Sequence, residues 1–179
     1  MSAWLQTTLG VVLGFAASYT FWWYLGTRVV PRIDFSDDLH SAEEGGGPRY
    51  WVVVCNQSRR RGVLEPRFLA TFRVLLPGKE LDSIWDVPVS NTKILRLAPG
   101  DERLLFLDPA GMSSFVREQI RLYGPDDVDV DTLSIEDLFG LGSDGRLTIE
   151  AIGFDERSST RKYLQSRVYR ADDVDRQKR

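Results

Sequence analysis

The sequence predicts a mainly β protein: a β-sandwich preceded by one N-terminal transmembrane α-helix. Residues 3–26 are 24 consecutive residues without a charge. Beyond them, short segments rich in valine, isoleucine and aromatic residues alternate with clusters of glycine, proline, asparagine and aspartate. Roughly seven or eight strands at this spacing indicate two packed sheets. We divide the chain into an anchor (residues 1–29), a sandwich domain (30–175) and a charged tail (176–179).

The composition argues against several classes of protein. A chain of 179 residues fits one domain with an appendage. The net charge of -3 argues against nucleic-acid binding, which usually requires a basic excess. Cys55 is the single cysteine, so an intramolecular disulfide is impossible. The last nine residues, 171–179, are mostly charged and are expected to fray.

The uncharged N-terminal stretch predicts membrane lipid as its partner. As a helix it would extend roughly 36 Å, enough to cross a hydrocarbon core of about 30 Å. Trp22, Trp23 and Tyr24 stand near its end, where aromatic rings prefer the headgroup level. Arg28 and Arg32 follow as interfacial anchors. By the positive-inside rule, these arginines place the N-terminus outside and the sandwich in the cytoplasm.

A cleaved secretion signal is the alternative for this stretch. It requires a basic segment before the apolar core, and no lysine or arginine precedes residue 28. Cleavage near residues 16–18 would leave an aromatic cluster at the mature N-terminus. The sequence therefore favours an uncleaved anchor.

Small residues recur at every fourth position of this stretch, at Gly10, Gly14 and Ser18. Such a stripe lets two helix backbones approach closely, so it predicts packing between copies of the helix. The alternative is that glycine is simply frequent in membrane helices.

Eight segments show the alternation or the β-branched composition that is typical of strands. In the third of them, Phe68, Ala70, Phe72 and Val74 fall on one face, which predicts that this face lies in the core. The eight segments are, in order, residues 29–36, 49–56, 63–76, 84–90, 93–99, 103–108, 146–156 and 162–171.

The segments between these strands are predicted to be loops, with two exceptions. Residues 113–122 have helical spacing and begin with serines that can cap a helix. A second helical turn is predicted where Ser134 precedes Asp137 in a partial capping box. Residues 36–48 and 124–132 are polar or acidic and are expected to be loops.

Two segments of the sandwich domain have a distinctive order of features. In VVVCNQSRRRGVLEPRFLATFRV (52–74), a strand ending in asparagine, a basic turn and a long second strand follow one another. IEAIGFDERSSTRKYLQSRVYRADDV (149–174) has the features of a closing hairpin. Both segments resemble the cytoplasmic domain of inward-rectifier potassium channels. The positions that match its hairpin are Gly153, Asp155, Glu156, Asp173 and Val174, whereas Arg167 and Tyr169 match with a slip of one residue.

The resemblance implies an immunoglobulin-like cytoplasmic sandwich that assembles as a homo-oligomer, which is a tetramer in that family. The sequence contains no second membrane helix, pore helix or potassium-filter motif, so conduction is not implied. What the resemblance implies is sensing and oligomerisation next to the membrane.

The sequence offers no recognisable catalytic residues, cofactor site or metal site, and we expect no enzyme. His40 is the single histidine and is expected to be solvated in a loop, whereas Cys55 is expected to be buried among valines. One histidine and one cysteine cannot build the usual zinc site. The acidic run 126–131 lacks the glycine and closing glutamate of a calcium loop. Asp155 and Glu156 are adjacent on a strand and are expected to point to opposite faces, unlike paired catalytic carboxylates.

Arg59, Arg60 and Arg61 form the densest basic run of the chain. On a turn they would bind anionic lipid, a phosphate-bearing ligand or an acidic partner, because guanidinium groups bind phosphate bidentately. The alternative is an exposed turn whose charge only favours solubility.

The sequence therefore predicts a single-pass membrane protein whose sandwich acts as a non-enzymatic module for sensing and oligomerisation. If several copies assemble, the helices would perturb the membrane. Two alternatives stay open. One is an accessory subunit that docks onto a separate channel or transporter, and the other is an exported ligand-binding sandwich.

Overall fold

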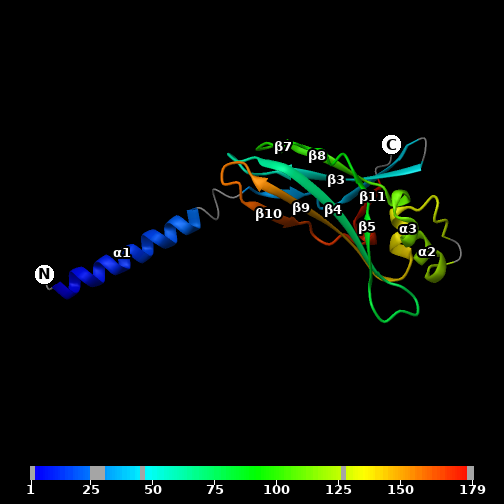
Figure 1. The fold of residues 1–179 in the computed structure, drawn as a ribbon, viewed down its shortest axis with the longest axis horizontal. Helices are drawn as coiled ribbons and strands as arrows, with labels where there is room; N and C mark the ends of the chain where they lie inside the picture. The colour runs from blue at the N-terminus through cyan, green and yellow to red at the C-terminus, as the bar shows by residue number, and fades with distance from the viewer. Residues whose placement is uncertain (1–2, 25–30, 45–46, 126–127, 177–179) are drawn as a thin grey trace.

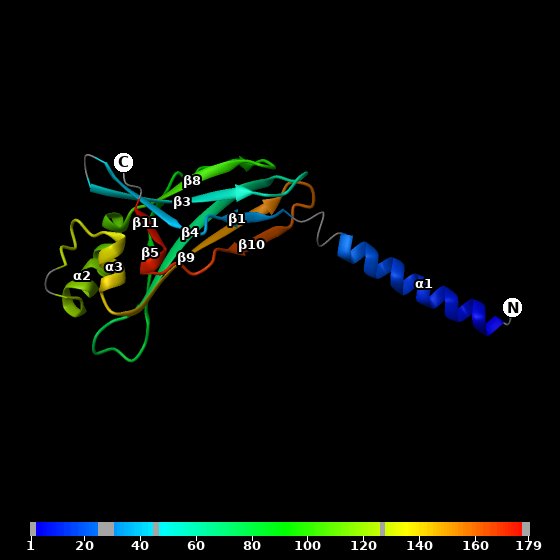
Figure 2. The ribbon, with the colours of Figure 1, turned by 180° about the vertical axis from the view of Figure 1, so that it is seen from behind.

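The computed structural model describes residues 3–24, 31–44, 47–125 and 128–176 of the chain. Helix α1 (Ala3–Tyr24) lies apart from the remaining elements, which are strands and short helices (Figure 1 and Figure 2). No helix within the described ranges is long and apolar enough to cross a membrane. Helix α1 confirms that the uncharged N-terminal stretch is helical. The predicted membrane crossing has no support from the structure.

The first sheet has the strand order β11-β2-β3-β8-β6, and β1 also pairs with β3. Neighbouring strands are antiparallel except β11, which runs parallel to β2. The strands are β1 (Ile33–Phe35), β2 (Leu39–Glu44), β3 (Gly47–Asn56), β6 (Val89–Ser90), β8 (Glu102–Leu107) and β11 (Val174–Arg176).

The second sheet has the strand order β10-β9-β4-β5, and β7 pairs with the beginning of β4. Its strands are β4 (Val63–Leu75), β5 (Ser83–Val87), β7 (Arg96–Leu97), β9 (Ser143–Asp155) and β10 (Arg161–Gln165). The described chain is therefore mainly β and forms a two-sheet sandwich, as the sequence predicts.

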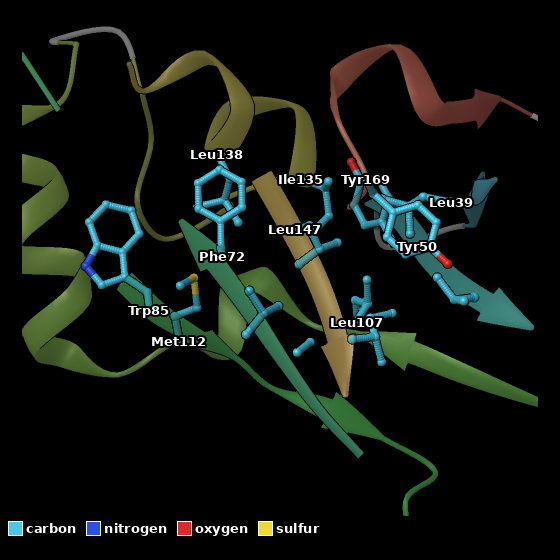
Figure 3. Packing of buried hydrophobic residues seen from close by; sticks show 14 of the residues in the cluster. Leu39, Tyr50, Phe72, Trp85, Leu107, Met112, Ile135, Leu138, Leu147 and Tyr169 are labelled. Carbon is cyan, nitrogen blue, oxygen red and sulfur yellow. The ribbon is translucent and has the colours of Figure 1, made fainter. Parts of the chain in front are cut away.

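The core lies between the sheets because alternate residues of the long strands face inward. In β4, all four residues that the sequence places on the inner face are buried. Phe72 stands at the centre of this packing, and its ring lies 6.3 Å from that of Trp85 (Figure 3). Phe139 meets the Phe72 ring edge-on at a centroid distance of 5.4 Å.

Two short helices lie at the end of the sandwich farthest from α1 (Figure 1). Helix α2 (Ser114–Tyr123) is capped by the Ser113 side chain, and helix α3 (Ile135–Gly140) begins with a capping box of Ser134 and Asp137. Both helices confirm the sequence prediction. Single 3-10 turns are formed by Pro109–Gly111 (η2) and Ala171–Asp173 (η3).

Residues 39–44 form strand β2, where the sequence predicts a loop. Leu39 is fully buried, and the segment pairs with β3 on one side and β11 on the other, so tertiary pairing overrides its polar composition. Residues Val174–Arg176 form strand β11, where the sequence predicts part of a frayed tail.

Three predicted strands are shorter than expected, and a fourth is divided. Of residues 29–36, strand β1 covers Ile33–Phe35, and residues 84–90 are divided between β5 and β6. Of residues 93–99, Arg96–Leu97 is strand, and of residues 162–171, strand β10 covers only the first part and ends at Gln165. Beyond β10, the chain turns back to the core at Tyr169, which is fully buried. Tyr169 and Leu147 exchange two backbone hydrogen bonds, of 2.8 and 2.9 Å, outside any regular strand pair.

Candidate functional site

Three turns and residues 31–33 meet at one end of the sandwich, the end nearest α1 in Figure 1. The Asn56 N–H donates to the Asp101 carbonyl at 3.0 Å, and the Asn56 carbonyl accepts from the Gly100 N–H at 2.8 Å. The Glu156 N–H donates to the Gly62 carbonyl at 3.2 Å, which joins the β9–β10 turn to the β3–β4 turn. We call this region the turn end; it consists of residues 31–33, 57–62, 98–101 and 156–160, with the strand residues that flank them.

Asp155 is the buried centre of the turn end, with 1% of its surface exposed. Its Oδ1 accepts hydrogen bonds from the Arg61 guanidinium at 2.8 Å, from the Ser158 N–H and hydroxyl at 2.7 and 2.8 Å, and from the Arg157 N–H at 3.0 Å. Burial acts to raise the pKa of this carboxyl, but the hydrogen bonds from Ser158 and Arg61 outweigh it and lower the pKa. Asp155 is therefore an ionised group that fastens two turns together.

The neighbouring carboxylate, Glu156, is bound to a different arginine. Its Oε1 lies 2.9 Å from the Arg96 guanidinium, and its Oε2 accepts from the Gly62 N–H at 3.0 Å. The hydrogen bond from Arg96 lowers the pKa of Glu156. A Cβ at position 62 would lie only 2.6 Å from Oε2 of Glu156, so a larger residue there would displace this carboxylate from its present position.

The structure separates the three arginines of the basic run. Arg61 is held inside the turn end by its ion pair with Asp155, and 17% of its side chain is exposed. Asn56, which is fully buried, donates its side-chain N–H to the Arg61 carbonyl at 2.9 Å and fixes the turn. Arg59 and Arg60 are exposed. The run therefore exposes two arginines, and its third arginine is an internal support.

Sequence reasoning missed two further arginines at the turn end. Arg157 and Arg161, in and just after the β9–β10 turn, are exposed like Arg59 and Arg60. In the described part of the chain, none of these four guanidinium groups has an ion pair or a hydrogen bond to another residue. No local pattern in the sequence singles them out, because they become neighbours of Arg59 and Arg60 only when two hairpin turns lie together at one end of the sandwich. Asp155 and Glu156 are already paired, whereas Asp34 and Glu102 add two exposed carboxylates at the flanking strands. With Arg32, the turn end therefore presents five exposed arginines beside these two carboxylates.

The residues predicted to contact lipid lie on α1 and just after it. Trp22, Trp23 and Tyr24 are exposed at the end of the helix, with 73, 56 and 51% of their surface accessible, and Arg32 is also exposed. Arg28 lies outside the described residues. Arg32 belongs to the turn end, and the end of α1 that carries the aromatic cluster is the end nearer to the sandwich (Figure 2).

The predicted helix-packing stripe is exposed along its whole length. Gly10, Gly14 and Ser18 are all accessible, and a Cβ placed at either glycine would meet no described atom within 4 Å. The stripe therefore has room for a second helix, and its predicted packing role stays a prediction.

His40 and Cys55 differ from their predicted surroundings. His40 lies on strand β2 rather than in a solvated loop; its ring stacks on Trp51 at 5.8 Å, and its Nδ1 lies 3.6 Å from Asp175. Cys55 is on the outer face of β3 and is half-buried rather than buried. Burial raises the pKa of the Cys55 thiol, and the carboxylates of Glu102 and Asp34 raise it further, which disfavours a reactive thiolate.

Comparisons with known proteins give no family for this chain: no protein-family model matches it, and no curated protein matches it. The similarity to inward-rectifier cytoplasmic domains therefore stays an interpretation of the sequence. Among the described residues, no group of three or more histidine, cysteine, aspartate or glutamate side chains is placed to hold a metal ion.

Proposed function

We propose that the protein is a membrane-attached, non-enzymatic binding module, in which α1 inserts into a lipid bilayer and holds the β-sandwich at the membrane surface. The observation that carries this proposal is the exposed apolar surface of α1. Leu9, Val11, Val12, Leu13 and Phe15 each have more than half of their surface accessible. An exposed apolar surface of this extent needs a partner, and lipid is the partner that fits an uncharged helix.

The polar side chains of α1 are compatible with a lipid environment. The Thr8 hydroxyl donates to the Trp4 carbonyl at 2.9 Å, and the Thr20 hydroxyl donates to the Ala16 carbonyl at 2.7 Å. These bonds within the helix reduce the cost of removing the hydroxyl groups from water. A helix that lies flat on a membrane has one strongly charged or polar face. Helix α1 has no charged residue, so it lacks such a charged face.

The charge of the turn end supports an orientation toward an anionic surface. Arg32, Arg59, Arg60, Arg157 and Arg161 are exposed at the end of the sandwich from which α1 departs. Each arginine near an anionic leaflet contributes about 1 kcal/mol to membrane binding. We therefore propose that the turn end faces the cytoplasmic leaflet, where anionic lipids are concentrated, with the sandwich in the cytoplasm.

The resemblance to inward-rectifier channels supports two finer proposals. The two-sheet architecture is compatible with an immunoglobulin-like sandwich, and the family assembles such domains into tetramers. We propose that copies of this chain also associate, with the exposed stripe of Gly10, Gly14 and Ser18 as the contact between helices.

Flotation of the full chain with lipid vesicles tests the membrane proposal. Vesicles of phosphatidylcholine are compared with vesicles that also contain phosphatidylserine. The full chain should float with both, and more completely with the anionic vesicles at low salt. The double variant Leu13→Glu/Phe15→Glu should remain at the bottom of the gradient, because each charge at the centre of a membrane helix costs about 2.5–3.5 kcal/mol.

A second pair of variants tests the orientation of the sandwich. Arg59→Gln/Arg60→Gln should lose about 2 kcal/mol of affinity for anionic vesicles, a factor of about 30. The matched control is Arg73→Gln/Arg121→Gln, which removes the same charge from exposed positions away from the turn end. Failure of the full chain to float would refute the membrane proposal, and equal losses from the two double variants would refute the orientation.

A further inference from the structure

A cavity of about 530 Å³ opens at the edge of strand β4. Strand β7 pairs with Val63 and Leu64, whereas the pairing with β5 begins at Ala70. Residues 67–69 therefore pair with β9 on one side and, in the described part of the chain, with no strand on the other, and Glu65 and Pro66 lie in a shift of the β9 register just before them. Figure 1 shows β7 and β5 at different positions along β4. The cavity occupies this gap.

The walls of the cavity combine a buried apolar part and an exposed apolar rim. Pro66 and Phe68 are buried, and Ile94 is partly buried and packs against the core. Leu69 and Leu95 line the same cavity with 48 and 84% of their surface exposed. A cavity of this size and composition is in the range of small-molecule sites, which are about 300–1,000 Å³ and mainly apolar.

The charged side chains that line the cavity give it a net positive charge. Arg67 and Lys93 line it, and neither has an ion pair or hydrogen bond with another described residue. Glu65 contributes one carboxylate to the same lining. Two cations and one carboxylate favour a ligand with one negative charge, in a protein whose net charge is -3.

The backbone around the cavity adopts conformations that side chains normally avoid. Glu65 has a φ of 46°, and Asn91, which precedes the opposite wall, has a φ of 63°. A β-bulge lies between Leu64 and Arg67. The Glu65 N–H donates to the Leu95 carbonyl at 2.9 Å, and this bond fixes the two walls to each other. Bulges and strained residues of this kind are concentrated at ligand sites.

We propose that this cavity binds an anionic amphiphile, a small molecule with one carboxylate or phosphate monoester group and a short apolar body. The apolar body lies against Pro66, Leu69 and Ile94, and the anionic group lies between Arg67 and Lys93. The apolar walls are necessary, because exposed cations alone bind a free anion only weakly. This inference goes beyond membrane attachment, and neither proposal depends on the other.

Equilibrium dialysis tests the inference with the full chain in a mild non-ionic detergent and with the detergent alone as the background. The probes are octanoate, hexyl phosphate, octanol and inorganic phosphate. We expect saturable binding of octanoate or hexyl phosphate at one site per chain, with the tighter of the two identifying the anionic group. Octanol should bind at least about fivefold more weakly, because it lacks the charge. Inorganic phosphate should show no saturable binding.

Charge variants give a signature that a general disturbance of the fold cannot produce. Arg67→Gln and Lys93→Gln should each weaken binding of the anionic probe by about fivefold, whereas Glu65→Gln should tighten it by about twofold to fivefold. Arg73→Gln, on the same strand and outside the cavity, should leave it unchanged. The inference is overturned if Arg67→Gln and Glu65→Gln shift the affinity in the same direction. It is also overturned if octanol binds as tightly as the anionic probes, or if free phosphate does.

Discussion

Replacing Arg61 with methionine removes the cation that faces the buried carboxylate of Asp155. The two side chains are 17% and 1% exposed, and their atoms are 2.8 Å apart. Removing one partner of a buried ion pair costs about 3–5 kcal/mol. Asp155 keeps its hydrogen bonds from Ser158 and Arg157, so we expect a smaller loss than this range, about 2–3 kcal/mol. This is a large share of the 5–15 kcal/mol by which a typical domain is stable.

Urea unfolding of the full chain in a mild non-ionic detergent measures this loss, with circular dichroism of the sheets as the signal. A loss of 2–3 kcal/mol lowers the midpoint by about 1–1.5 M for a slope near 2 kcal/mol/M. The matched control is Arg60→Met, one residue away, exposed and unpaired among the described residues. It should change the free energy of unfolding by less than about 0.5 kcal/mol. Equal effects of the two substitutions would refute the role assigned to Asp155.

The pH dependence gives a second test of the same pair. The pKa of Asp155 is lowered in the folded state, so its contribution to stability is present above its unfolded pKa of about 3.9. It is lost as the pH falls through the folded pKa. The difference between the wild type and Arg61→Met should therefore be largest near neutral pH and should shrink below about pH 4. A difference that is independent of pH would mean that Arg61 acts through packing alone.

Two further predictions concern other parts of the chain. Ser134→Ala removes the side chain that caps α3 and should cost about 1 kcal/mol in the same urea assay, with Ser90→Ala, at an exposed position of β6, as the neutral control. Gly10→Ile/Gly14→Ile should leave that stability unchanged, because a Cβ at either glycine meets no described atom. It should reduce the particle mass measured by light scattering in detergent, and an unchanged oligomeric mass would remove the role of the stripe.

The sequence predicts the fold best where a single strand shows a clear alternation of apolar and polar residues. The alternation of Phe68, Ala70, Phe72 and Val74 is sufficient to identify the inner face of β4, because burial repeats every second residue. Strand β2 cannot be found in this way. It has one fully buried aliphatic residue, Leu39, and its partner β11 lies near the other end of the chain.

The candidate site is predictable only in part, for a related reason. The basic run is visible in the sequence, but Arg61 and Asp155 are 94 residues apart, and no local spacing shows that they form a pair. Consequently, the sequence does not reveal that Arg61 is an internal support. Arg157 becomes a candidate only after two hairpin turns are brought together. The cavity depends on a gap between two partners of β4, which is a property of the sheet and not of any one segment.

The most direct test of the account is the depth of α1 in lipid. A spin label is attached to Phe15→Cys in a Cys55→Ser background, and in a second sample to Leu81→Cys, an 80% exposed position in the loop before β5. Collisions with oxygen and with a water-soluble nickel complex are then compared in nanodiscs. We predict that the label at position 15 is accessible to oxygen and shielded from nickel, whereas the label at position 81 shows the reverse. Nickel accessibility at position 15 equal to that at position 81 would contradict membrane insertion of α1.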